Sequence, residues 1–160
     1  MRAASIYYYF ESKEQLFEQV LEIGLRLAFD AVRKAVEALP DTANHRERIN
    51  AAVEAHLSML LEYGDYSSAN IHNFGQTPVD IQERQLELRH TYGEYWRKLL
   101  TDAQENNQIR KDVDLSLLRM FLFGAMNWSL EWVKPGKMAA AEIARQLCQT
   151  LFDGIDTELR

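Results

Sequence analysis

Apolar residues recur at every third or fourth position along most of the chain, which is the spacing of amphipathic α-helices. The first and longest such segment, residues 12–39, begins with the capping box Ser12-Lys-Glu-Gln15 and ends before Pro40, which cannot continue a helix. One stripe of this segment consists of Leu16, Val20, Ile23, Leu27, Ala31 and Ala35. We therefore expect a long helix with this stripe turned toward the core.

The same periodicity predicts four further helices. One covers residues 49–61 and closes at Tyr63-Gly64, and a less regular segment, 66–75, follows it. The next begins with Thr77 as N-cap and Pro78 at the first helical position, and runs to Asn106-Asn107. Residues 115–133, opened by Asp112 or Asp114, are apolar on nearly every face, and residues 139–156 carry two adjacent apolar stripes. No segment alternates as a strand does, so we expect one all-α domain of about six helices.

Composition agrees with a globular helical chain. Its 160 residues include only 7 Gly and 3 Pro, and 47% of them are apolar. The single Cys148 cannot form an internal disulfide, and no apolar run reaches the roughly 20 residues that cross a bilayer. We expect a cytoplasmic protein that is not associated with a membrane. The net charge is −6 and neither half of the chain is basic, so any contact with nucleic acid must be confined to a small patch.

Signatures of catalysis are missing from the sequence. The four histidines are scattered without metal-ligand spacing, and the chain has no glycine-rich phosphate loop and no Gly-x-Ser-x-Gly motif. Cys148 lies within an apolar stripe and has no histidine near it in sequence. His56 lies among apolar positions, which favours a hydrogen-bonded core histidine over a metal ligand. We therefore expect no catalytic residues, no metal and no cofactor, and a protein that is not an enzyme.

The first residues carry a more specific signal. The string Ser5-Ile-Tyr-Tyr-Tyr-Phe10-Glu-Ser-Lys13-Glu-Gln-Leu16 resembles the end of the helix-turn-helix of TetR-type transcriptional regulators, from the recognition helix to the start of the connecting helix. The resemblance implies a homodimeric repressor that leaves operator DNA when a small hydrophobic effector binds. It also implies that Ile6 and Phe10 pack inward, and that the major groove and the phosphates are contacted by Arg2, Ala3, Ser5, Tyr7, Tyr8, Tyr9 and Lys13.

This resemblance divides the chain into two parts. Residues 1–12 correspond to the remnant of a DNA-binding helix-turn-helix, reduced to its recognition helix. Residues 13–160 correspond to the ligand-binding and dimerisation domain, with 13–39 as the connecting helix. The chain begins after the position of the helix that braces the recognition helix in this family, so an alternative stays open. In that alternative, the chain is a ligand-binding or heterodimerising module without DNA binding, as its acidic net charge also suggests.

The last two predicted helices carry more apolar surface than a chain of this length easily covers, which points to a homodimer. In TetR-type regulators these two helices pair with their two-fold mates as a four-helix bundle. The residues expected at the interface are Leu118, Leu122, Met126, Leu147, Leu151, Phe152 and Ile155. The alternative is that all of them belong to the core of a single chain.

The effector class rests on a shorter resemblance. Residues 124–136 are similar to a subgroup of TetR-type repressors that control fatty-acid or sterol breakdown and respond to acyl-CoA thioesters. A pocket for such a molecule needs apolar and aromatic walls and a few polar groups. Candidates for the walls are Met59, Tyr63, Phe74, Tyr92, Trp96, Phe121, Asn127 and Trp128, with Arg84 or Arg89 for an anionic headgroup. For each of them the alternative is ordinary core packing or a solvated ion pair.

Overall fold

The computed structural model describes residues 12–134 and 137–155, and all regular structure in these residues is helical. The expected recognition helix and the residues predicted to contact DNA, apart from Lys13, lie outside the described residues. The first described helix, α2 (Lys13–Glu37), starts where the capping box predicts. The hydroxyl of Ser12 accepts a hydrogen bond of 3.1 Å from the backbone N–H of Gln15. The long helix and its N-cap are thus confirmed.

The buried side of α2 differs from the predicted one. Leu21, Val32 and Val36 are buried, whereas Ile23 and Leu27, which belong to the predicted stripe, are 46% and 38% exposed. The prediction was wrong because α2 carries apolar residues on two adjacent sides. The neighbouring helices, which the local sequence does not specify, determine which side is covered.

The next helix, α3 (His45–Glu62), begins four residues before the first apolar position of its stripe. A capping box explains this early start. The side chain of Asn44 accepts a hydrogen bond of 2.9 Å from the N–H of Glu47, and the carboxylate of Glu47 accepts one of 2.8 Å from the N–H of Asn44. The helix closes at Tyr63.

The segment that follows α3 is a series of short helical turns. These are α4 (Gly64–Ser68), the π-helical turn η1 (Ala69–Asn73) and the 3₁₀ turn η2 (Phe74–Gln76). The next helix, α5 (Val79–Glu105), has Pro78 as its N-cap residue, one position later than predicted. The hydroxyl of Thr77 instead donates a hydrogen bond of 2.6 Å to the carbonyl of Phe74 and so closes the preceding turn.

Two helices complete the described chain. For α6 (Leu115–Trp132), the carboxylate of Asp114 accepts hydrogen bonds of 2.8 and 3.0 Å from the N–H groups of Ser116 and Leu117, which settles the choice between Asp112 and Asp114. The last helix is α7 (Ala140–Ile155). Both lie within one or two residues of their predicted bounds. Among the described helices, none is both long and apolar enough to cross a membrane.

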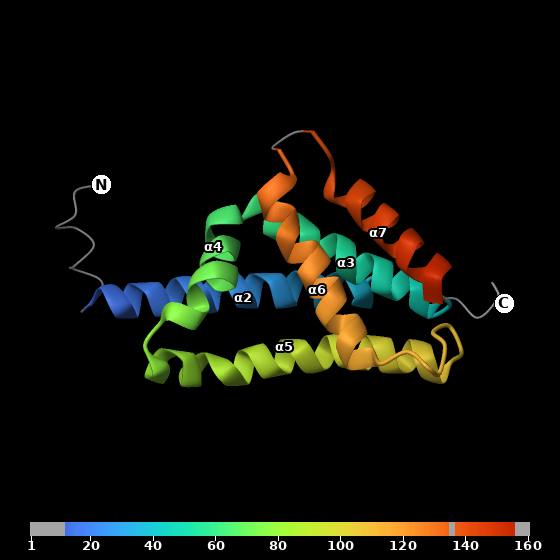
Figure 1. The fold of residues 1–160 in the computed structure, drawn as a ribbon, viewed down its shortest axis with the longest axis horizontal. Helices are drawn as coiled ribbons and strands as arrows, with labels where there is room; N and C mark the ends of the chain where they lie inside the picture. Colours follow the sequence, from blue (N-terminus) through green and yellow to red (C-terminus); the bar gives the residue numbers. More distant parts are fainter. Residues whose placement is uncertain (1–11, 135–136, 156–160) are drawn as a thin grey trace.

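Figure 1 shows how these helices are arranged. The helices α2 and α5 run side by side along the long axis, α6 crosses over them, and α7 packs along α3. The main core brings together α2, α3, α5, α6 and α7, and it includes fully buried Trp96, Leu57 and Met126. A second, smaller cluster of Leu21, Ala69 and Ile81 fixes the N-terminal half of α2 to η1 and α5. The start of α2 is therefore held by its own set of contacts.

Candidate functional site

A cavity of about 550 Å³ lies between α2, α3, η1, α5 and α6. Its size falls in the range of ordinary small-molecule sites. Buried His56, Leu60 and Tyr92 form its inner wall, and the exposed side chain of Met120 lies at its rim. The lining consists of Leu25, Ala28, His56, Leu60, Ser67, Asn70, Ile71, Phe74, Gly75, Arg89, Tyr92, Gly93, Arg119, Met120, Phe123 and Asn127. It is thus apolar and aromatic, with a few polar groups and no carboxylate.

The polar groups of the inner wall form a hydrogen-bonded chain. Nδ1 of His56 lies 2.7 Å from the hydroxyl of Tyr92, and Nε2 lies 3.3 Å from Oδ1 of Asn127. Because an amide oxygen only accepts, Nε2 of His56 carries the hydrogen and the hydroxyl of Tyr92 donates to Nδ1. Burial lowers the pKa of His56 to about 4 and raises the pKa of Tyr92, so both side chains are neutral at pH 7. The predicted hydrogen-bonded core histidine is confirmed.

Aromatic rings support this wall. The ring of Phe123 meets those of His56 and Trp96 edge-on, with centroids 5.4 Å apart in both pairs. The ring of Phe29 lies 5.3 Å from that of Tyr92. These rings pack against His56 and Tyr92 and hold both side chains in the inner wall.

Two arginines supply the positive charge of the cavity. The guanidinium of Arg89 stacks on the ring of Phe74, 3.5 Å from its centroid, and donates a hydrogen bond of 2.7 Å from Nη2 to Oδ1 of Asn70. Burial lowers the pKa of Arg89 to about 10, which leaves it charged at pH 7. Arg119 donates a hydrogen bond of 3.0 Å from Nη1 to the carbonyl of Gly93. A Cβ at Gly93 would lie 2.7 Å from that nitrogen, so this contact needs a glycine.

The predicted pocket residues divide into two groups. Phe74, Arg89, Tyr92 and Asn127 line the cavity. The other six do not line it, and they are Met59, Tyr63, Arg84, Trp96, Phe121 and Trp128.

Each residue outside the lining has a different environment. Trp96 is buried in the core behind the cavity, and Met59 and Tyr63 lie elsewhere on α3 and at its end. Arg84 lies on the surface of α5, where it pairs with Glu18 of α2 at 2.6 Å and with Asp80 at 3.0 Å. Trp96 is therefore accounted for by core packing and Arg84 by a solvated ion pair, whereas Met59 is half-buried and Tyr63 is exposed.

Sequence reasoning missed three residues of the lining that carry much of its chemistry: Asn70, Arg119 and Phe123. Phe123 lies one helical turn before Asn127, so its place on the same side of α6 could have been read from the spacing. Asn70 lies in the π-helical turn η1, which no pattern in the sequence announced.

The outer side of α6 is apolar and exposed. Phe121 and Trp128 are 68% and 63% exposed, and Leu117, Met120 and Trp132 are exposed as well. Apolar residues on all sides of α6 would suit a helix surrounded by neighbours. Within one chain, however, this side of α6 is not covered. Contiguous exposed apolar residues of this kind are typical of protein–protein interfaces.

The residues expected at a subunit interface lie elsewhere. Leu118, Leu122, Met126 and Phe152 are buried in the core of the single chain, so assigning them to the interface was wrong and the core alternative holds for them. The apolar residues that stay exposed on α6 lie on another side of this helix. Leu147 and Leu151 are half-buried on α7, and the side chain of Ile155 lies outside the described residues.

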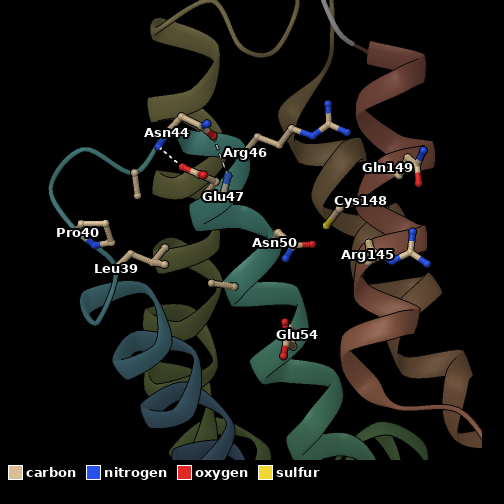
Figure 2. A pocket seen from close by; sticks show the side chains of 12 residues that line it. Leu39, Pro40, Asn44, Arg46, Glu47, Asn50, Glu54, Arg145, Cys148 and Gln149 are labelled. Atoms are coloured by element: carbon tan, nitrogen blue, oxygen red, sulfur yellow. Dashed lines mark hydrogen bonds between the residues drawn. The ribbon is translucent and has the colours of Figure 1, made fainter.

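A second hollow, of about 610 Å³, lies between the start of α3 and α7 (Figure 2). Its walls carry both acidic and basic side chains, and those of Asn44 and Glu47 are engaged in the capping box. Cys148 points from α7 toward α3, and burial raises the pKa of its thiol to about 11, so it is no nucleophile at pH 7. The described residues also contain no cluster of three or more His, Cys, Asp or Glu side chains able to hold a metal ion. Unlike the cavity, the described lining of this groove contains no aromatic ring and includes two carboxylates, Glu47 and Glu54.

Comparison with known proteins identifies the fold. The family of tetracyclin repressor-like C-terminal domains matches residues 42–155. The chain therefore belongs to the TetR family of transcriptional regulators, and the all-α fold and the family inferred from the sequence are both confirmed.

The relatives are named transcriptional regulators. The HTH-type transcriptional repressor KstR2 of Mycobacterium tuberculosis is 26% identical over 166 residues, covering 98% of this chain and 78% of the relative. The solved structure of the ketosteroid transcriptional regulator KstR2 from the same organism has a TM-score of 0.84 at 21% identity, covering 98% and 80% of the two chains. AibR, solved in complex with isovaleryl coenzyme A and operator DNA, has a TM-score of 0.79 at 24% identity, covering 95% and 81%.

Proposed function

We propose that this protein is a homodimeric repressor that binds operator DNA and leaves it when a small hydrophobic effector enters the cavity. One observation carries the proposal. Leu25 and Ala28 of α2 line the cavity, and the same helix begins at Lys13, directly after the segment that resembles a TetR recognition helix. A ligand in the cavity thus touches the helix that leads to the DNA-binding segment.

The mechanism is a shift between two populations of the dimer. Operator binding needs the two recognition helices at a separation that matches successive major grooves. An effector that fits the cavity better when α2 has moved stabilises dimers with a different separation, and these bind the operator less tightly. We propose that Lys13, which is exposed at the first position of α2, contacts a phosphate.

For the effector we propose an acyl-CoA thioester. The apolar and aromatic walls suit an acyl chain, and the arginines suit a group that carries negative charge. The structural neighbour AibR was solved with isovaleryl coenzyme A, which supports testing this class first.

For the dimer we propose that the exposed side of α6 pairs with the same surface of a second copy, with α7 beside it. Phe121 and Trp128 lie on that side and are the aromatic anchors that a stable interface needs.

The test uses protein purified from its native cells and DNA from the region upstream of its own gene. Fluorescence anisotropy at 150 mM salt measures binding while acyl-CoA thioesters of graded chain length are added. We expect sequence-specific binding that at least one thioester abolishes. Binding that is absent, or that differs little between operator and random DNA, contradicts the proposal, because non-specific binding needs only charge.

The net charge of −6 favours a second function, that of a ligand-binding or heterodimerising module without DNA binding. In that case the same protein shows no specific DNA binding, binds the thioester, and captures a longer TetR-type relative through α6 and α7.

A further inference from the structure

Asn70 is the polar side chain through which the cavity contacts the backbone of α2. Its Nδ2 donates hydrogen bonds of 3.0 Å to the carbonyl of Leu21 in α2 and of 3.2 Å to the carbonyl of Tyr66 in α4. Its Oδ1 accepts the hydrogen bond of 2.7 Å from Arg89. A single amide therefore joins a cationic side chain of the cavity to a main-chain carbonyl of the helix that begins at Lys13.

The contact between Asn70 and α2 depends on Gly24. A Cβ at this position would lie 2.8 Å from Nδ2 of Asn70 and 3.1 Å from Cβ of Tyr66. The absence of a side chain thus lets η1 approach the bare backbone of α2. The π-helical turn Ala69–Asn73 presents Asn70 at this point, and π-helical turns within helices frequently occur at functional sites.

The guanidinium of Arg89 is not matched by an anion in the part of the chain that the structure describes. Its Nε is buried and has no hydrogen-bond partner there, and no carboxylate lines the cavity. A second cation, Arg119, lines the same cavity. Removing a cation from water without a counter-charge is unfavourable, and a buried donor without a partner needs an explanation. Both features are explained if the cavity normally receives an oxyanion.

Building on the proposed effector cavity, we infer that Arg89 binds an oxyanion of the effector, a carboxylate or a phosphate, and that Asn70 transmits this binding to α2. Guanidinium groups bind such anions through two parallel N–H donors. An anion that takes the N–H of Nε and the adjacent N–H of Nη2 draws the guanidinium of Arg89 toward itself and away from Oδ1 of Asn70, which is bonded to the same Nη2. The amide then loses one of its anchors, and its bond to the carbonyl of Leu21 weakens. Binding of the anion therefore loosens α2 from η1.

The first experiment tests Arg89 with three probes of equal chain length: decanoate, decanoyl-CoA and uncharged 1-decanol. Titration calorimetry on the 160-residue chain measures their affinities for the wild type and for Arg89→Gln. We expect the variant to bind the acidic probes at least 10-fold more weakly and decanol within about 3-fold of the wild type. Arg97→Gln, an exposed arginine on the same helix that pairs with Glu94, is the matched control and leaves all three affinities unchanged.

The two acidic probes distinguish the sources of the anion. If Arg89→Gln weakens the binding of both acidic probes, a carboxylate is sufficient as the anion that Arg89 binds. If it weakens the binding of decanoyl-CoA alone, Arg89 binds a phosphate of the coenzyme. Equal loss for all three probes shows that Arg89 only packs, and this overturns the inference, as does the failure of both acidic probes to bind. Arg89→Lys keeps the charge and loses the paired donors, so its affinity for the acidic probes is expected to lie between those of the wild type and Arg89→Gln. This variant also tests the inference if Arg89→Gln does not fold.

The second experiment tests Asn70 as a positioning residue. Hydrogen exchange of residues 17–28 is followed with and without the acidic probe that binds. In the wild type we expect exchange to rise at least 3-fold on binding, with no rise for decanol. In Asn70→Ala we expect fast exchange without any probe, no further change on binding, and an affinity for the probe within 3-fold of the wild type. A variant that responds as the wild type does overturns the coupling.

These outcomes are separate from those of the DNA experiment. If the protein binds no operator but Arg89→Gln still discriminates acidic from neutral probes, the repressor proposal fails and the anion site stands. If the operator complex responds to thioesters while Arg89→Gln leaves their binding unchanged, the anion site fails and the repressor proposal stands.

Discussion

His56 is an ionisable side chain that the fold keeps neutral. It is buried beside the cavity and hydrogen-bonded at both ring nitrogens, to Tyr92 and to Asn127. A protonated ring would carry charge in an apolar site and would turn Nδ1 from acceptor to donor, which the hydroxyl of Tyr92 could meet only by reversing its hydrogen bond. Protonation of His56 would therefore disturb the cavity wall and lower the stability of the folded domain.

The free energy of unfolding should therefore fall in mild acid. Burial lowers the pKa of His56 to about 4 in the folded state, against about 6.5 in an unfolded chain. Between these two values the unfolded state binds a proton that the folded state does not, so stability is complete above pH 6.5 and is lost as the pH falls toward 4. Urea unfolding at pH 7 and pH 4.5 should differ by about 2–3 kcal/mol through this group, at about 1.4 kcal/mol per pKa unit.

Two variants isolate the contribution of His56. Replacing it by Gln should remove most of the loss between pH 7 and 4.5, while His90→Gln, an exposed histidine on α5, should leave the loss intact. Carboxylates titrate in the same pH range and also change the free energy of unfolding. The contribution of His56 is therefore the difference between the wild type and His56→Gln in the loss from pH 7 to 4.5. An NMR titration that found His56 protonating near pH 6.5 in the folded protein would contradict this account.

The helices show which parts of the sequence determine structure locally. Ser12, Asn44 and Asp114 cap their helices through hydrogen bonds to residues two or three positions away, so local patterns can place these boundaries. The exposed and buried sides of α2 could not be assigned in this way, because the choice between two apolar sides is made by α3 and α5.

The cavity shows the same division between local and distant information. Phe74, Arg89, Tyr92 and Asn127 were predicted because a pocket needs aromatic walls and a few polar groups. The same criterion also selected six residues that do not line the cavity. The role of Asn70 depends on a π-helical turn and on an approach to Gly24 across 46 positions of chain, both of which are tertiary. The α6 residues predicted for the interface, Leu118, Leu122 and Met126, are buried, because a helix that is apolar on all sides gives no periodicity to distinguish its outer side.

At the level of elements, the contact between α2 and η1 should not tolerate a methyl group at Gly24. Gly→Ala within a helix ordinarily stabilises by about 1 kcal/mol. Here the added Cβ would come within 2.8 Å of Nδ2 of Asn70 and 3.1 Å of Cβ of Tyr66, so the segments must separate. Overpacking of this kind costs about 1–3 kcal/mol, and we expect the two effects to give a net loss of about 1 kcal/mol in urea unfolding.

Gly154→Ala is the matched control for Gly24→Ala. Gly154 is also helical, but a Cβ there meets no atom of the described residues within 4 Å. Because it lies near the end of α7, its substitution should be neutral or stabilise by up to about 0.5 kcal/mol. Equal effects of the two substitutions would mean that η1 does not press on α2.

At the level of the whole molecule, the described residues include two apolar surfaces that differ in their surroundings. One lies between the helices and lines the cavity, and the other is exposed on the outer side of α6. If the second surface pairs with its own copy, each dimer contains two cavities, each with its own α2. The position of one α2 relative to the other then depends on both the cavity and the α6 pairing.

Breaking the α6 surface should therefore dissociate the protein without unfolding it. Phe121→Asp and Trp128→Asp each place a carboxylate where we expect an apolar contact between copies. Loss of one central aromatic residue at an interface commonly costs 2 kcal/mol or more, and burying an unpaired charge costs further energy, so the double variant should raise the dimer Kd at least about 100-fold. Sedimentation equilibrium measures this change. Leu86→Asp, an equally apolar and 54% exposed position on α5, should leave the dimer intact.

Because Phe121 and Trp128 line no part of the cavity, the monomeric double variant should still bind the acidic probes. Loss of probe binding along with the dimer would show instead that a second copy completes the cavity.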